Sequence, residues 1–292
     1  MVRTESLGHD ARRRAAARPI GTARSLLAAV VALAAVCCRA SEPTATVVVT
    51  TSMIEAAARS LLEESGGSIT VLRLQPPGSC PGHFDLAGGD LARLKSAARV
   101  LRHDYQGVLD GKLAGMAGGG VCTVALATPG SLLIPRHFLA LAEDVQAQLA
   151  DVQPARAAEV RSCLDRLRSQ LTTLEQQARA KAAEWVDWPV VASSQQREFC
   201  QWLDLRVVGE LPRAEDLSPR QLAVLQRSGA KAVVGNLQSD SRAAAVLAER
   251  LGVPLAVLSN FPGAEGYGET YADLVRRNLE ELSRVCQRRS PN

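Results

Sequence analysis

Apolar and polar positions over residues 44–127 alternate between short β-branched runs and helical spacing. Runs of three to eight apolar residues bounded by turn residues are typical of buried strands, and apolar residues at steps of three and four are typical of helices. We therefore expect strands over residues 44–51, 69–74, 99–101 and 121–127 and helices over 52–64, 89–97 and 108–114. Regular alternation of strand and helix predicts an α/β lobe with a parallel sheet.

The second half of the chain repeats this pattern. The same reasoning predicts strands over residues 189–192, 206–209, 231–235 and 255–258 and helices over 194–203, 218–227, 242–251 and 271–288. A further helix over 136–150 precedes a longer one that begins at Pro154. We expect the second half to form a second α/β lobe.

The longer helix separates the two lobes. Its apolar residues recur at steps of three and four from Val160 to Trp185, which predicts one amphipathic helix. Some thirty residues at about 1.5 Å each give a rod of roughly 45 Å, long enough to lie beside both lobes. A coiled-coil dimer seam is the weaker alternative because flanking charge pairs are not sustained. The predicted fold class is α/β, with lobes at 41–153 and 187–292 joined by a rigid helix at 154–186.

The first forty residues have the features of a signal peptide. A region rich in arginine precedes the uncharged apolar run 25–36, and small residues stand before Ser41, where we expect cleavage. Twelve apolar residues are too few for a permanent membrane span. Export to the periplasm follows, with a lipid anchor through Cys37 or Cys38 as an open alternative.

Removing this segment changes the charge balance. The first forty residues hold seven arginines and two acidic residues, so the remainder has 27 basic and 28 acidic residues and a net charge of −1. No basic stripe with interleaved aromatics appears, which argues against nucleic acid as a partner. Five cysteines remain, and Cys80 is the one in a loop beside a histidine.

That loop carries the most distinctive chemistry. The segment P-P-G-S-C-P-G-H-F-D at 76–85 follows the strand at 69–74, and its prolines force a stiff turn. It brings together Cys80, His83 and Asp85. Thiolate, imidazole and carboxylate suit zinc or another late divalent transition metal. The alternative is a proline-rich turn with a capping aspartate and an incidental histidine.

Nearly the whole chain after residue 40 resembles one protein family, and three segments carry this resemblance. They are V-V-V-T-T-S-M-I at 47–54, L-Q-P-P-G-S-C-P-G-H-F-D-L-A-G-G-D-L at 74–91 and Y-A-D-L-V-R-R-N-L-E-E-L at 271–282. They are similar to the cluster A-I periplasmic metal-binding family, the zinc/manganese solute-binding proteins of bacterial ABC importers. The resemblance implies a periplasmic binding protein fold with a central cleft, a transported metal ion, a membrane permease as partner and a monomeric protein.

The ligands of that family do not carry over. The family uses two histidines from the first lobe and a histidine or glutamate and an acidic residue from the second. Its ligand positions fall on or near residues that are poor metal ligands: Gly82, Gly130, Ser193 and Ser259-Asn260. Binding of a bare divalent ion in the family's manner is therefore in doubt.

Other polar residues follow strands of both lobes. For the first lobe we expect a metal shell of Cys80, His83 and His103, with the rings of His83 and His103 within about 7 Å and Asp85 as a further ligand-binding residue. For the second lobe we expect ligand contacts from Gln196, Asn236, Gln238 and Asn260, with Asn260 or Gln196 facing the histidines. The alternatives are a turn cap for His103, a solvated helix face for Gln196, and turns held by the asparagines.

Four functions follow in order of preference. The first is capture of a transition metal ion or metal complex for an ABC importer. The second is binding of a non-metal small ligand or chelate, because amides without a carboxylate suit a neutral or anionic ligand. The third is an envelope adhesin with a degenerate site. An enzyme is least favoured because no G-x-S-x-G, H-E-x-x-H or phosphate loop is present.

Overall fold

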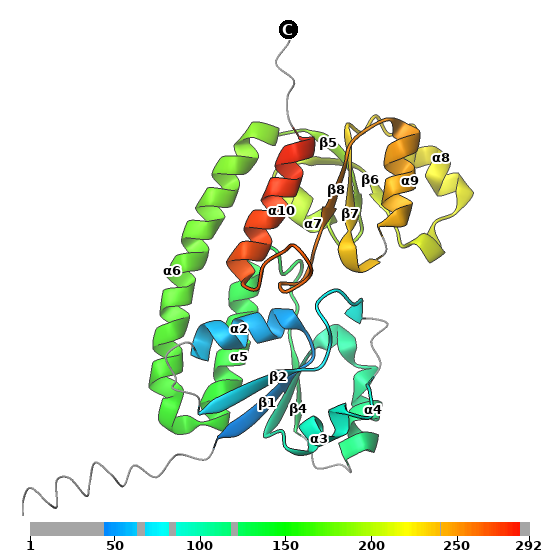
Figure 1. Ribbon diagram of the computed structural model, residues 1–292. Helices are drawn as coiled ribbons and strands as arrows, with labels where there is room; N and C mark the ends of the chain where they lie inside the picture. The colour runs from blue at the N-terminus through cyan, green and yellow to red at the C-terminus, as the bar shows by residue number, and fades with distance from the viewer. Residues whose placement is uncertain (1–43, 63–67, 82–85, 118–121, 240, 287–292) are drawn as a thin grey trace, which may run out of the picture. The chain divides into compact units, whose positions relative to one another are not determined.

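The computed structural model describes residues 44–62, 68–81, 86–117, 122–239 and 241–286. Its first half contains a four-stranded parallel sheet with the strand order β2-β1-β3-β4 (Figure 1). The strands are β1 (Ala45–Val49), β2 (Ile69–Arg73), β3 (Arg99–His103) and β4 (Thr123–Leu126). The helices of this half are α2 (Ser52–Leu62), α3 (Asp90–Lys95) and α4 (Leu109–Ala117).

The second half repeats this topology in a separate sheet of order β6-β5-β7-β8, again fully parallel. Its strands are β5 (Pro189–Ser193), β6 (Arg206–Leu211), β7 (Ala232–Asn236) and β8 (Leu255–Leu258). Its helices are α7 (Arg197–Trp202), α8 (Pro219–Leu225), α9 (Arg242–Leu251) and α10 (Tyr271–Val285). In both sheets the chain moves to one side of its first strand and then crosses to the other. This crossing creates a switch point beside β1 and beside β5, where open α/β sheets bind ligands.

The two sheets are joined by α5 (Pro135–Val152) and α6 (Ala157–Ala182), with a 3-10 turn at Pro154–Arg156 between them. Figure 1 shows α6 as a long helix beside α10 and α2, and residue contacts confirm both pairings. Its buried face is the stripe that the periodicity predicts: Val160, Cys163, Leu164, Leu167, Leu171, Leu174, Ala178 and Ala182. Because this stripe is covered by helices of its own chain, it is not available as a dimer seam. The predicted fold class of two parallel-sheet lobes joined by a long helix is confirmed.

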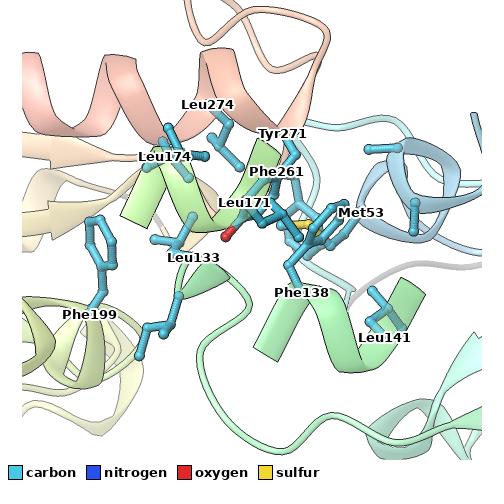
Figure 2. Packing of buried hydrophobic residues seen from close by; sticks show 14 of the residues in the cluster. Met53, Leu133, Phe138, Leu141, Leu171, Leu174, Phe199, Phe261, Tyr271 and Leu274 are labelled. Atoms are coloured by element: carbon cyan, nitrogen blue, oxygen red, sulfur yellow. The ribbon is translucent and has the colours of Figure 1, made fainter. Parts of the chain in front are cut away.

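One hydrophobic core is shared by the inner faces of both sheets. Val47 and Val49 of β1 and Val190 of β5 all belong to it, whereas Val48 points to the opposite face and a smaller cluster under α3 and α4. This alternation follows from the two-residue period of a strand. Met53, Phe138 and Tyr271 pack at its centre (Figure 2), where the rings of Phe138 and Tyr271 are stacked with centroids 3.7 Å apart.

The described residues from Thr44 onward form one compact unit. The boundaries at 153/154 and 186/187 therefore stay a prediction about lobes that share one core. The predicted signal peptide at 1–40 lies outside the described residues. Among the helices that the structure describes, none is long and apolar enough to cross a membrane.

One strand boundary differs from the prediction in a way that matters for the site. The pattern ends the third strand at Leu101, but β3 continues through Arg102 to His103, which pairs with Leu126 of β4. Because Arg102 and His103 are polar, the hydropathy pattern does not show that the strand continues through them. Both are buried because each has polar partners: Asp110 for Arg102, and two threonine hydroxyls for His103.

Candidate functional site

A cavity of about 580 Å³ lies where the carboxyl ends of the strands of both sheets meet. Residues that follow β2, β3 and β4 contribute Cys80, Tyr105 and Thr128 to its wall, together with the loop around Ser131. Because all strands of a sheet are parallel, their carboxyl ends meet at one edge, so residues far apart in the sequence line one space. The second sheet contributes the remainder from the corresponding edge, with Ser194, Arg213, Asn236, Gln238 and Asn260.

Three of the four predicted amides of the second sheet form one hydrogen-bonded network. Gln196 Nε2 donates to Asn260 Oδ1 at 2.9 Å, and the backbone N–H of Asn260 donates to Gln238 Oε1 at 3.0 Å. Gln238 Nε2 in turn donates to Ser259 Oγ at 2.9 Å and to the carbonyl of Pro77 at 3.3 Å. Asn260 and Gln238 line the cavity, whereas Gln196 lies fully buried behind Asn260 and holds its side chain in place. The solvated-face alternative for Gln196 is wrong.

Asn236, the fourth predicted amide, differs from the others. It ends β7 beside the switch point, lines the cavity and is only 3% exposed. Within the described part of the chain neither its Oδ1 nor its Nδ2 has a hydrogen-bond partner. Leaving a buried amide unpaired costs about 1–3 kcal/mol, so such a group calls for an explanation.

His103 is a buried, hydrogen-bonded histidine. Its Nε2 lies 2.9 Å from Thr51 Oγ1 and its Nδ1 lies 3.2 Å from Thr128 Oγ1, while Tyr105 stacks on the ring with centroids 5.0 Å apart. Burial lowers its pKa to about 4, partly offset by the charge of Asp104. Both ring nitrogens are therefore engaged, and a metal ion would have to displace a threonine hydroxyl to bind here.

The remaining predicted metal ligands are only partly described. Cys80 is half-buried and lines the cavity, but His83 and Asp85 lie outside the described residues. Over residues 44–286, apart from the gaps given above, no group of three or more histidine, cysteine, aspartate or glutamate side chains could hold a metal ion. The shell of Cys80, His83 and His103 stays a prediction.

Glu198 is a site residue that the sequence reasoning missed. It belongs to α7 of the second sheet, yet its Oε2 accepts the backbone N–H of Ser131, in the loop after β4, at 2.6 Å. Its Oε1 lies 3.7 Å from Nδ1 of His137, on the first turn of α5. A Cβ added at Gly130 would lie 2.6 Å from Oε1 of Glu198, so the carboxylate occupies the space that any side chain at Gly130 would need.

Arg213 is the second missed residue. It follows β6, lines the cavity and is half-buried. Its guanidinium has neither a hydrogen bond nor an ion pair with any described residue. The sequence signal for Arg213 was a charge that closely follows the strand β6, and for Glu198 it was a charge in the first turn of the helix after β5. Spacing alone does not say which way either side chain points.

Comparison with known proteins agrees with this arrangement. A family model described as ZnuA, zinc-uptake complex component A periplasmic, matches residues 131–285, more than half of the chain. No curated protein matches the chain in sequence.

Several solved structures share the fold over more than four fifths of this chain. The periplasmic zinc binding protein TroA from Treponema pallidum superimposes with a TM-score of 0.71 at 17% identity, covering 84% of this chain and 100% of TroA. A structure of ZnuA gives 0.70 at 13% identity, with 84% and 100% covered. A periplasmic metal binding protein from Candidatus Liberibacter asiaticus gives 0.70 at 13% identity, with 83% and 100% covered, and a cadmium-bound form of it gives 0.69.

Proposed function

Because the chain belongs to the ZnuA family, zinc-uptake complex component A periplasmic, we propose that it is the extracytoplasmic solute-binding component of an ABC importer. In this role it captures a transition metal ion or a metal complex between its two sheets and delivers it to a membrane permease. The solved relatives named for zinc, for metal and for a bound cadmium ion support a divalent transition metal as cargo or as part of it. Transport requires binding and release and no chemical step.

The observation that carries this proposal is the convergence of polar side chains from both sheets on one cavity. Cys80 and Thr128 line one side of the cavity and Asn236 and Asn260 the other, so a ligand held there would touch both sides. Only a ligand that contacts both sides favours the state in which they are close, so binding and closure are coupled. An adhesin with a degenerate site predicts a cleft without such convergence, and we do not propose it.

Two bridges across the cavity support a small closing motion. Glu198 accepts the N–H of Ser131, and Gln238 donates to the carbonyl of Pro77. The long helix α6 packs against α2 of the first half and α10 of the second, which limits how far the two halves can separate. We infer that the site opens by shear or a slight rotation and not by a wide hinge swing.

The N-terminal segment enters the proposal as the export signal. We expect the exported protein to begin at or near Ser41, because the arginine-rich and apolar regions end there. N-terminal sequencing of the stable protein checks this. Retention of Met1 would contradict periplasmic localisation, whereas lipid modification at Cys37 or Cys38 would change only the mode of anchoring.

Native mass spectrometry with elemental analysis tests the function. The full chain is expressed with its own N-terminal segment, purified from the periplasm without chelators, and compared with Asn260→Ala, which removes one polar side chain from the cavity wall. We expect the wild-type protein to carry a solute that contains a transition metal, and the variant to lose most of it. Wild-type protein that carries no solute of any kind would contradict the proposal.

A second candidate function is the binding of a metal-free organic ligand on the same scaffold. The unpaired amide of Asn236 favours it, because an amide oxygen and nitrogen together match an organic donor and acceptor better than a metal ion. In the same mass spectrum this candidate predicts an organic adduct without metal.

A further inference from the structure

The unpaired polar groups of the cavity wall indicate which chemical groups a ligand must present. Asn236 lies at the end of β7, almost completely buried, and within the described residues neither polar atom of its side chain is paired. A carboxamide offers one acceptor and two donors side by side. A ligand that presents a donor next to an acceptor would pair both groups at once, whereas a metal ion could use only the oxygen.

The charges of the wall point in the same direction. Two of the described residues that line the cavity are charged, Glu198 and Arg213. The carboxylate of Glu198 already accepts the N–H of Ser131 and lies 3.7 Å from a ring nitrogen of His137. The guanidinium of Arg213 has no partner among the described residues. Among the described residues of the wall, Arg213 is therefore the charged side chain whose hydrogen bonds a ligand would have to supply.

Amides beside an unpaired guanidinium are poor ligands for a naked divalent cation. Guanidinium groups recognise carboxylates through two parallel hydrogen bonds, a geometry that a metal ion cannot use. The described residues also contain no group of three side chains able to ligate a metal. The described residues of this cavity therefore do not complete a metal shell by themselves, and a partner molecule of the metal would supply the missing ligands.

We propose that the ligand of this cavity is a small molecule bearing carboxylates, free or as an anionic metal chelate, with Arg213 binding a carboxylate and Asn236 pairing with an adjacent donor and acceptor. This inference rests on the proposed role of the cavity as the solute site of a binding protein, and it narrows the chemical class of that solute. Arg213 and Asn236 then decide specificity, because they favour an anionic complex over the bare ion.

Isothermal titration calorimetry with four probes tests the inference. The probes are citrate, zinc citrate, zinc chloride, and hexaamminecobalt(III) as a compact cationic complex without carboxylates. We expect citrate or zinc citrate to bind more tightly than zinc chloride, and the cobalt complex not to bind. Binding of citrate alone identifies a metal-free carboxylate as sufficient, whereas binding of zinc citrate alone identifies the chelate.

Three variants assign the binding to the wall. Arg213→Gln removes the charge and should weaken binding at least tenfold, which corresponds to about 1.4 kcal/mol. Arg220→Gln is the matched control, because Arg220 is exposed on α8 and does not line the cavity. Asn236→Leu should abolish binding without lowering the urea midpoint of the empty protein, since it removes an unpaired buried amide. If the role of Asn236 were purely structural, the urea midpoint of Asn236→Leu would instead be lower than that of the wild-type protein.

The outcomes separate this inference from the proposed function. Tight binding of zinc chloride that is unchanged in Arg213→Gln and Asn236→Leu would overturn the inference and leave metal capture intact. Failure of citrate and zinc citrate to bind would also overturn it, whether or not the periplasmic protein carries another solute. Protein that carries no solute when purified from the periplasm would overturn the proposed function itself.

Discussion

Replacing His103 with glutamine distinguishes a structural histidine from a metal ligand. His103 is fully buried, and each ring nitrogen lies within hydrogen-bond distance of a threonine hydroxyl. Glutamine keeps a polar group near Thr51 and Thr128 but cannot take up a proton at mild pH. The comparison therefore isolates the titration of the imidazole.

The magnitude follows from the pKa of His103. Burial lowers this pKa from 6.5 to about 4, so the folded protein keeps the ring neutral at a pH where the unfolded chain is protonated. The unfolded state therefore binds more protons below pH 6.5. The contribution of the neutral His103 to the free energy of unfolding is fully present above pH 6.5 and falls as the pH drops towards 4. For one such group the free energy of unfolding should decrease by about 2 kcal/mol between pH 7.5 and pH 5.

Urea unfolding of the wild-type protein and His103→Gln at these two pH values measures the difference. We expect the variant to be less stable at pH 7.5, because the smaller side chain leaves space in the core, but to lose about 2 kcal/mol less than the wild type at pH 5. Equal pH sensitivity of the two proteins would refute the buried neutral histidine. Stabilisation by zinc that disappears in the variant would instead assign His103 to a metal shell.

Two further predictions concern Glu198 and the buried thiols. Gly130→Ala should destabilise the protein by about 1–2 kcal/mol, because its new Cβ displaces the half-exposed Glu198 carboxylate from the Ser131 N–H. The same change in a Glu198→Ala background should cost clearly less, and an equal cost in both backgrounds would exclude the proposed clash. Burial raises the pKa of the thiol of Cys286 to about 12, so a thiol reagent at pH 8 should label half-buried Cys80 quickly and Cys286 only on unfolding. Rapid labelling of Cys286 in the folded protein would contradict this burial.

The architecture could be predicted from local pattern because each element has a clear hydrophobic period. The eight strands that the structure describes lie where short apolar runs predict them, and the buried stripe of α6 agrees residue by residue from Val160 to Ala182. The prediction failed at the end of β3, where Arg102 and His103 are polar but buried. Hydropathy cannot reveal such positions, because their burial depends on partners elsewhere in the chain.

The candidate site could be predicted only in part. The rule that ligands bind at the carboxyl ends of parallel strands led to Cys80, Asn236, Gln238 and Asn260, all of which line the cavity, while their contacts with a ligand stay a prediction. It could not identify Glu198, whose role depends on reaching the first-half loop at Gly130. Nor could it show that Asn236 is unpaired while the other amides are linked. Both properties arise from how the two sheets meet, which no local pattern records.

A crystal structure of the protein purified from the periplasm with its own solute would show directly whether the cavity between the two sheets is the solute site. Anomalous scattering locates a metal, and ordinary electron density shows any organic part of the ligand. We expect density inside the cavity, in contact with Asn236 or Asn260 on one side and with Cys80 or the Ser131 loop on the other. A solute bound elsewhere, with this cavity holding only water, would contradict this expectation.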